Sequence, residues 1–297
     1  MDIAYYPGCS LKQSSSLYDH QNRLIFERLG IHLREIDDWN CCGATSAGKT
    51  DDFLAMAMPA RNLGIAMSTG LKEMVIPCSA CYSRTLVAQK YLDHHEDLKE
   101  EINSGLAQKI KGEFKVSSIL EVLLKTLETG TLLEKAVKKP SLLKPVCYYG
   151  CMMTRFPFDV PVPDDAENPQ GMETLLKAIG LQPIDWNYKT NCCGASAAVN
   201  EPETAMNLMG KIMKDAVSMG ANCMVVTCPM CQLNLDAHQN TFCRDQGIME
   251  RLPVLFITEV LGMAMNFSVE DLQIDRHFVD ATGLFRELEE TGAEKKS

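Results

Sequence analysis

The sequence predicts an α/β fold of two tandem, pseudo-symmetric domains, each a small, mostly parallel sheet with helical crossovers. One cysteine pattern occurs twice, about 150 residues apart, whereas solenoid repeats are only about 20–50 residues long. In each copy, short apolar runs alternate with segments of helical periodicity, an order typical of parallel sheets. We therefore expect an N-terminal domain over residues 1–140, a C-terminal domain over 141–285 and a disordered tail over 286–297.

The elements are expected at matching positions of the two copies. The expected strands cover residues 3–6, 73–76, 145–149 and 223–227, and the expected helices cover 52–69 and 203–219. The extra residues of the second copy fall in 158–171, a stretch rich in Pro, Asp and Asn that predicts a surface loop. Ligands of parallel sheets collect at the carboxyl ends of the strands, where the cysteines of this chain fall. Helices that begin after these turns would direct backbone N–H groups towards the thiolates.

Composition narrows the classes of partner. The 39 acidic residues outnumber the 29 basic ones, for a net charge of −10, and the basic residues are scattered, so a nucleic-acid partner is not expected. We find no run of about 18 apolar residues and no signal-peptide pattern at the N-terminus. The sequence therefore predicts a cytoplasmic protein without a membrane span.

Thirteen cysteines are the dominant feature of the sequence. An odd number excludes complete internal pairing, and a chain of this size can bury a core without disulfides, so metal or redox chemistry is the leading interpretation. Ten of the cysteines form the repeated pattern, which reads C-x31-CC-x35-C-x2-C in the first copy and C-x40-CC-x34-C-x2-C in the second. The flanking residues also match: Asn40–Thr45 aligns without gaps with Asn191–Ser196, and Met74–Cys81 with Met224–Cys231.

Five cysteines in each copy favour an iron–sulfur cluster over zinc. Zinc is satisfied by four thiolates, and so is an ordinary cubane cluster. Adjacent cysteines diverge, so a vicinal pair suits a large cluster better than a single ion. Structural zinc in one or both halves stays open as an alternative, as does thiol exchange at the CxxC pairs.

The ten-cysteine pattern resembles the B-type subunit of heterodisulfide reductase from Asp2 to about Met265. The residues that carry the resemblance are Tyr6-Pro7-Gly8-Cys9, the two Asn-Cys-Cys-Gly-Ala motifs and the two CxxC pairs. The resemblance implies two CCG domains, each holding a noncubane [4Fe-4S] cluster, which face each other across a pseudo-two-fold axis. It implies one cluster on Cys9, Cys41, Cys42, Cys78 and Cys81, and the other on Cys151, Cys192, Cys193, Cys228 and Cys231.

The resemblance also implies a function and partners. A disulfide between the clusters would be split by two electrons, as for the coenzyme M–coenzyme B heterodisulfide of methanogenesis. The chain has no ferredoxin-type cysteine run of its own. Electrons are therefore expected from the iron–sulfur, C-type subunit of such a complex, which is fed by the flavin-containing, A-type subunit. The alternative is a zinc- or cluster-stabilised scaffold or electron-relay subunit of an organic-acid-oxidising complex.

Candidate substrate contacts follow from charge and position. An anionic disulfide would need cations near the clusters, and Lys12, Lys49, Arg84 and Arg155 lie within seven residues of a predicted ligand. Thr45 and Ser196 occupy matching positions after the two CCG motifs and could donate hydrogen bonds to cluster or substrate.

Two further features are expected to have no role in metal binding. Gly43–Thr50 matches the phosphate-loop pattern, but no buried apolar strand precedes it in the sequence, so nucleotide binding is not expected. Three cysteines outside the repeats, Cys147, Cys223 and Cys243, are expected in the core as small apolar residues.

Overall fold

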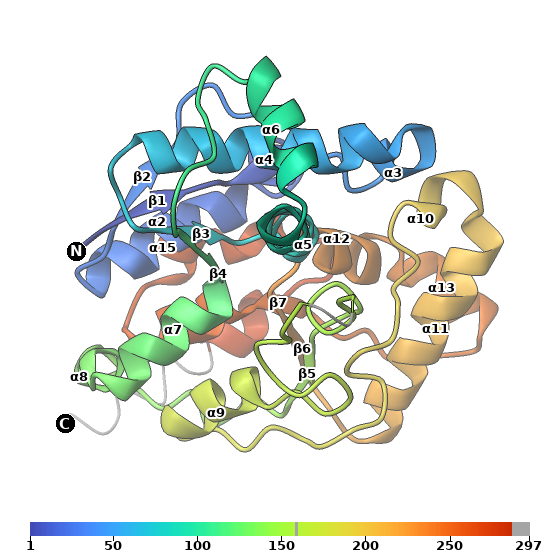
Figure 1. The fold of residues 1–297 in the computed structure, drawn as a ribbon. Helices are drawn as coiled ribbons and strands as arrows, with labels where there is room; N and C mark the ends of the chain where they lie inside the picture. Colours follow the sequence, from blue (N-terminus) through green and yellow to red (C-terminus); the bar gives the residue numbers. More distant parts are fainter. Residues whose placement is uncertain (158–159, 287–297) are drawn as a thin grey trace.

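Two small parallel sheets form the framework of the computed structural model, which describes residues 1–157 and 160–286 (Figure 1). The first sheet has the order β2-β1-β3-β4, with β1 at Asp2–Tyr5, β2 at His32–Glu35, β3 at Glu73–Ile76 and β4 at Lys115–Ser118. The second has the order β5-β6-β7, with β5 at Pro145–Tyr148, β6 at Cys223–Val226 and β7 at Val254–Phe256. Every strand pair is parallel.

Helices follow the strands in both halves. The helices of the N-terminal half are α1 (Gly8–Leu11), α2 (Ser16–Arg28), α3 (Ala47–Thr50), α4 (Asp52–Ser68), α5 (Ser79–His94), α6 (Glu96–Gly105), α7 (Ile119–Glu128) and α8 (Thr131–Lys135). Those of the C-terminal half are α9 (Gly171–Ala178), α10 (Ala197–Asn200), α11 (Pro202–Ser218), α12 (Pro229–Ala237), α13 (Gln239–Asp245), α14 (Ile257–Ala264) and α15 (Val269–Leu272), before a short 3₁₀ helix at Ile274–Arg276.

The α/β prediction is confirmed, together with the expected strands and the two long helices. All four residues of β5 and of β6 are buried, as expected of parallel strands covered on both faces. Of the predicted tail, residues 287–297 lie outside the described residues. No helix of the described chain is both long and apolar enough to cross a bilayer.

Strands β2, β4 and β7 were not predicted. In β2, at His32–Glu35, three of the four residues are polar, and the residues alternate between exposed and half-buried positions along the edge of the first sheet. Such a strand lacks the apolar run by which a buried strand is recognised. In the C-terminal half, the corresponding edge has a single bridge between Val146 and Ile184.

The two halves pack against each other reciprocally. Helix α2 of the first half packs on α14 of the second, and α9 of the second packs on α7 of the first (Figure 1). The ring of Tyr18 on α2 stacks on Phe256 at a centroid distance of 3.8 Å. This exchange of equivalent helices is the contact pattern that a pseudo-two-fold axis produces.

Two equivalent glutamates, Glu121 and Glu259, lie in the first turns of α7 and α14. Glu121 accepts a hydrogen bond from the backbone N–H of Ser118 at 2.7 Å, and Glu259 accepts one from the N–H of Phe256 at 2.8 Å. Each glutamate therefore satisfies an N–H that the helix leaves without an intrahelical partner.

A buried charged group ties the C-terminal segment to both halves. The ring of His277 lies 2.7 Å from Glu259 and 3.6 Å from Asp236, and Gln21 on α2 donates to Glu259 at 2.8 Å. Burial lowers the pKa of His277, but the two carboxylates outweigh burial and raise the pKa from 6.5 to about 10. His277 is therefore a buried imidazolium at neutral pH.

Candidate metal centre

Six of the ten cysteines of the repeat follow the carboxyl ends of the strands β1, β3, β5 and β6, and the two vicinal pairs follow the edge segments. Cys9 follows β1 within α1, and Cys78 follows β3 as the residue that caps α5. Cys151 follows β5, and Cys228 follows β6 as the cap of α12. Parallel strands that end at one edge thus bring together cysteines that are distant in sequence.

The five cysteines of the first half form a connected set. The Sγ atoms of Cys9 and Cys41 are 3.9 Å apart, and Cys42 lies close enough to Cys41 and Cys81 for both thiols to shift its pKa. Cys81 also contacts Cys78. Hydrogen bonds from Cys41 and Cys81 lower the pKa of the Cys42 thiol, and the positive charge of Arg84 lowers that pKa further.

The second half repeats these contacts. Cys151 and Cys192 lie close enough to shift each other's pKa, and the Sγ atoms of Cys193 and Cys231 are 3.6 Å apart. Cys228 and Cys231 also shift each other's pKa. The hydrogen bond from Cys151 lowers the pKa of the Cys192 thiol. Both CCG turns also donate a backbone hydrogen bond to sulfur, from Gly43 to Cys41 and from Gly194 to Cys192, at 3.5 and 3.3 Å.

The two sets meet at the joint between the halves. The thiols of Cys78 and Cys228 lie close enough to shift each other's pKa, raising that of Cys78 and lowering that of Cys228, and both residues are buried. Helix α1 of the first half also packs on α12 of the second. The ten thiols therefore form one continuous region rather than two remote sites.

Glycines let the first cysteine loop of each half approach the CxxC pair. Gly8 has a φ of +74°, and a Cβ atom there would lie 2.9 Å from Sγ of Cys81. Gly150 has a φ of +67°, and a Cβ atom there would lie 3.0 Å from Sγ of Cys231. Both the left-handed backbone and the close contact require glycine at these positions.

The donor set fits an iron–sulfur cluster in its chemistry. Each half offers five thiols, with one tyrosine hydroxyl beside them, that of Tyr6 in the first half and that of Tyr148 in the second. Within residues 1–157 and 160–286, no group of three or more His, Cys, Asp or Glu side chains is placed to hold one metal ion. The thiols instead form series of pairwise contacts, an arrangement that suits a cluster of several iron atoms better than a single ion.

The sequence of each half matches the profile of the CCG cysteine-rich domain, over residues 3–84 and 146–236. The chain belongs to this family. A subunit of 8-methylmenaquinol:fumarate reductase from Wolinella succinogenes, named as its membrane anchor, is 34% identical over 95% of this CCG chain and 99% of its own length. The B-type subunit of a CoB-CoM heterodisulfide reductase from Methanosarcina acetivorans is 26% identical over 98% of each chain.

A solved structure supports the fold alone. A hypothetical protein from Helicobacter pylori superposes with a TM-score of 0.69 at 14% identity, over 95% of this CCG chain. The chain spans about half of that structure, 52% of its length.

The three cysteines outside the CCG pattern are buried, as predicted. Cys147, Cys223 and Cys243 are fully inaccessible, and burial raises the pKa of Cys223 to about 12. None of them joins the ten-thiol region through a described hydrogen bond. The structure therefore accounts for them as core residues.

Three of the predicted substrate contacts line one cavity. Thr45, Lys49 and Arg84 lie around a cavity of about 590 Å³ beside the first CCG turn. Lys12 is not among them, because it pairs with Glu35 at 2.8 Å and with Asp19 at 3.4 Å. In the second half, Arg155 is exposed four residues after Cys151, and Ser196 caps the short helix α10.

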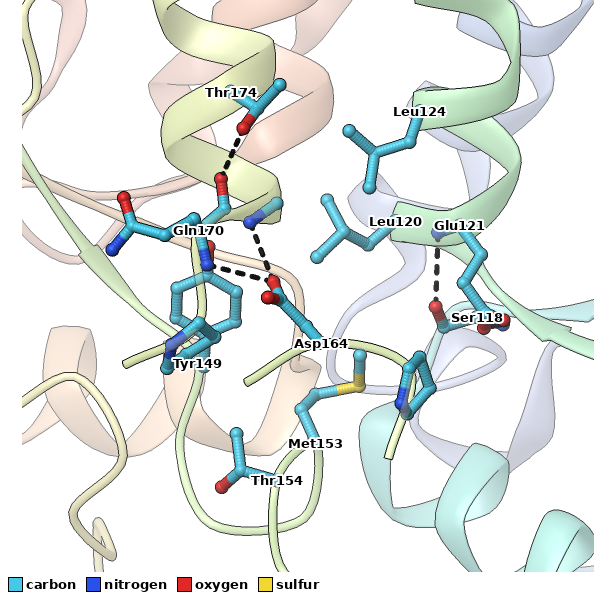
Figure 2. A pocket seen from close by; sticks show the side chains of 13 residues that line it. Ser118, Leu120, Glu121, Leu124, Tyr149, Met153, Thr154, Asp164, Gln170 and Thr174 are labelled. Carbon is cyan, nitrogen blue, oxygen red and sulfur yellow. Dashed lines mark hydrogen bonds between the residues drawn. The ribbon is translucent and has the colours of Figure 1, made fainter. Parts of the chain in front are cut away.

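A second cavity of about 240 Å³ lies between α7 and α9 (Figure 2). Figure 2 shows Leu120 and Leu124 of α7 facing Gln170 and Thr174, with Met153 at one end. Asp164, from the stretch that is longer in the second half, accepts hydrogen bonds from the N–H groups of Gln170 and Gly171. The cavity is therefore closed by residues that have no counterpart in the first half.

Two residues that position the cysteine loops escaped prediction. Lys189 is 3% exposed and pairs with Glu173 at 2.9 Å, while its carbonyl accepts from the N–H groups of Tyr149 and Gly150. Asn234 donates to the carbonyls of Cys193 and Ala195 at 3.3 and 3.0 Å. No local pattern marks either residue, since their role depends on partners 16 to 41 positions away in sequence.

Proposed function

We propose that this chain is the two-cluster subunit of a reductase complex, in which two noncubane [4Fe-4S] clusters together reduce a disulfide by two electrons. The observation that carries the proposal is the contact between Cys78 and Cys228, which joins the two five-thiol sets. Splitting a disulfide consumes two electrons and two protons and yields two thiols. Two one-electron centres that meet at one joint suit that stoichiometry.

The chain itself would hold and shape the site. Bound clusters would supply one-electron transfer and a thiophilic metal. Gly43 and Gly194 donate N–H groups to cysteine sulfur, and α5 and α12 begin at Cys78 and Cys228 with their N-terminal ends towards the thiols. Both features favour negative charge on sulfur. Six of the ten thiols, at Cys42, Cys78, Cys81, Cys193, Cys228 and Cys231, are buried, which keeps water from the inner side of the site.

Partners would supply the electrons. The relatives are subunits of multi-subunit reductases, and we propose that an iron–sulfur protein and a flavin-containing protein of the same complex are the donors. The disulfide itself would be a small molecule that reaches the clusters from the side of the less buried cysteines.

Electron relay in an organic-acid complex is the second candidate. The 34% identity to a subunit of a methylmenaquinol:fumarate reductase favours it. The cavity of Figure 2 also favours it, because its leucine wall and its closeness to Met153, two residues after Cys151, suit an apolar ring beside the second site. In that role, the clusters would pass electrons singly and no disulfide would be cleaved.

Metal analysis and reoxidation test the proposal. Protein purified without oxygen should contain about eight irons, about eight sulfides and negligible zinc per chain. One or two zincs with little iron would overturn both candidates that use clusters. Dithionite-reduced protein is then mixed either with alkyl disulfides or with menadione. Oxidation by a disulfide with release of two thiols supports the first candidate, and oxidation by menadione alone supports the second.

A further inference from the structure

The cavity beside the first CCG turn carries two cations whose equivalent positions in the second half are neutral. Lys49 lies on α3 and Arg84 on α5, and both line the cavity with the hydroxyl-bearing Thr45. Aromatic and aliphatic side chains form the remaining wall, among them Phe53, Met56, Tyr91 and Leu98. The cavity thus combines two cations with an apolar side.

Arg84 is poised for a ligand. Its Nε atom is buried and has no hydrogen-bond partner among the described residues. No ion pair of the described chain involves Arg84 or Lys49. A buried guanidinium donor without a partner is costly unless an acceptor or water fills the place. Arg84 also lies close enough to Cys42 to act on that thiol electrostatically.

The equivalent positions of the second half are neutral. Gly43–Lys49 aligns without gaps with Gly194–Asn200, and Cys81–Arg84 aligns with Cys231–Asn234, so asparagine replaces both cations. The amide of Asn234 is already used, since it donates to Cys193 and Ala195. Asn234 therefore uses its amide to hold the second CCG turn, whereas the equivalent Arg84 has an Nε–H without a hydrogen-bond partner among the described residues.

We propose that this cavity binds one carboxylate or sulfonate group of the acceptor, so that the acceptor has a single orientation, with its anionic arm in the first half. The assignment of the ligand as an acceptor rests on the proposed disulfide reduction. Asp52 also lines the cavity, and two cations against one carboxylate leave a net charge of +1, which suits one anionic group. The apolar wall would take the carbon chain of that arm.

Calorimetric titration of the cluster-loaded protein tests the binding site directly. The probes are hexanesulfonate and hexanoate, with 1-hexanol as the uncharged match. The anions should bind and hexanol should bind at least about tenfold more weakly, since a charge-assisted pair is the main source of affinity. Arg84→Gln and Lys49→Gln should each weaken anion binding about tenfold, and Arg84→Lys should restore part of it.

Lys90→Gln is the matched control. Lys90 lies on the same helix as Arg84 but pairs with Asp93 and does not line the cavity. The Lys90→Gln variant should leave anion binding unchanged, and the iron content should be equal in all variants. Equal affinity for hexanol and hexanoate, or unchanged binding by Arg84→Gln, would overturn the proposal, as would tighter binding of Mg-ATP than of hexanesulfonate.

Turnover separates this proposal from the proposed function. With a disulfide that carries one carboxylate arm, Arg84→Gln should raise KM about tenfold more than it does with a neutral disulfide of the same length, so the ratio of the two KM values isolates the anionic contact. Disulfide turnover that does not depend on the anionic arm would refute anion binding in the cavity and leave the proposed disulfide reduction intact. Anion binding by a protein that no disulfide oxidises would support the binding site and refute disulfide reduction.

Discussion

The two halves of this chain share what places the thiols and differ in what surrounds them. Tyr6 donates to the carbonyl of Asn40 at 2.8 Å, and its counterpart Tyr148 donates to the carbonyl of Asn191 at 2.6 Å. The outer surroundings differ, because Cys9 and Cys41 are exposed whereas Cys151 and Cys192 are half-buried. The duplicated scaffold therefore preserves two similar thiol sets while giving each a different approach to solvent and ligand.

Removal of one buried ligand thiol from the second half should have the largest effect, because it makes the two thiol sets unequal. Cys193→Ala removes a buried thiol of the second set, so iron should fall from about eight to about four atoms per chain. Disulfide reduction should fall to background, because a two-electron step would lack its second centre. Iron analysis and thiol release measure both effects. Cys243→Ala, a buried cysteine outside the sets, is the control and should keep its iron. Full activity in Cys193→Ala would rule out a two-cluster mechanism.

Glycine substitution should separate the halves without touching a thiol. In Gly8→Ala, the new Cβ would lie 2.9 Å from Sγ of Cys81, so the first set should lose about half of the iron of the chain. Gly30→Ala is matched in backbone, with a φ of +75° and no atom within 4 Å of the new Cβ. It should cost about 1–2 kcal/mol of stability and no iron. Equal iron loss in the two variants would show that backbone strain, not contact with Cys81, is the cause.

The buried imidazolium of His277 should make the stability of the second half depend on pH more than that of the first half. Glu259 pairs with His277, whereas the equivalent Glu121 has no histidine partner among the described ion pairs and faces Tyr82, whose pKa it raises. The pKa of His277 is about 10 in the folded chain and 6.5 ordinarily, so its stabilisation is complete below about pH 6.5 and is lost as the pH rises through 10. His277→Ala should lower the free energy of unfolding by about 3–5 kcal/mol, since it leaves two buried carboxylates without their cation.

Urea unfolding at pH 6 and pH 10.5 measures this effect. The wild type should lose stability between the two values, and His277→Ala should lose less. A variant as pH-sensitive as the wild type would place the titrating group elsewhere.

The smallest expected difference concerns the paired tyrosines. Tyr148→Phe removes the hydrogen bond to Asn191 and should cost about 1 kcal/mol. Tyr6→Phe should cost less, because the carbonyl of Asn40 also accepts from Asn62 at 2.7 Å. Thermal unfolding of the two variants side by side measures the difference. The opposite order would mean that Asn62 does not compensate for the lost tyrosine.

Local patterns predicted the strands β1, β3, β5 and β6 and the two long helices α4 and α11. The strands before Cys78 and Cys228 are apolar and short, and a helical pattern precedes each of them in the sequence. Strand β2 was missed because its polar residues are stabilised by pairing with β1, not by burial of an apolar run.

Long-range packing decided the features that escaped prediction. The contact of Cys78 with Cys228 joins residues from different halves, and no spacing within one copy encodes it. Lys189 has the chemistry of a surface residue and is buried only because Glu173 and Asp185 neutralise it. Lys12 is within reach of Cys9 in sequence, yet its ion pairs with residues of α2 and β2 hold it away from the cavity that Lys49 and Arg84 share.

The position of Cys78 and Cys228 also bears on how the proposed clusters would enter the protein. Both thiols are buried where α5 and α12 begin, at the joint between the two halves. Iron and sulfide that arrive after the halves have docked would have to enter past the less buried cysteines, Cys9, Cys41, Cys151 and Cys192. Under the proposed function, these four cysteines therefore mark the side on which the clusters would be loaded, and the joint would hold the inner ligands in place.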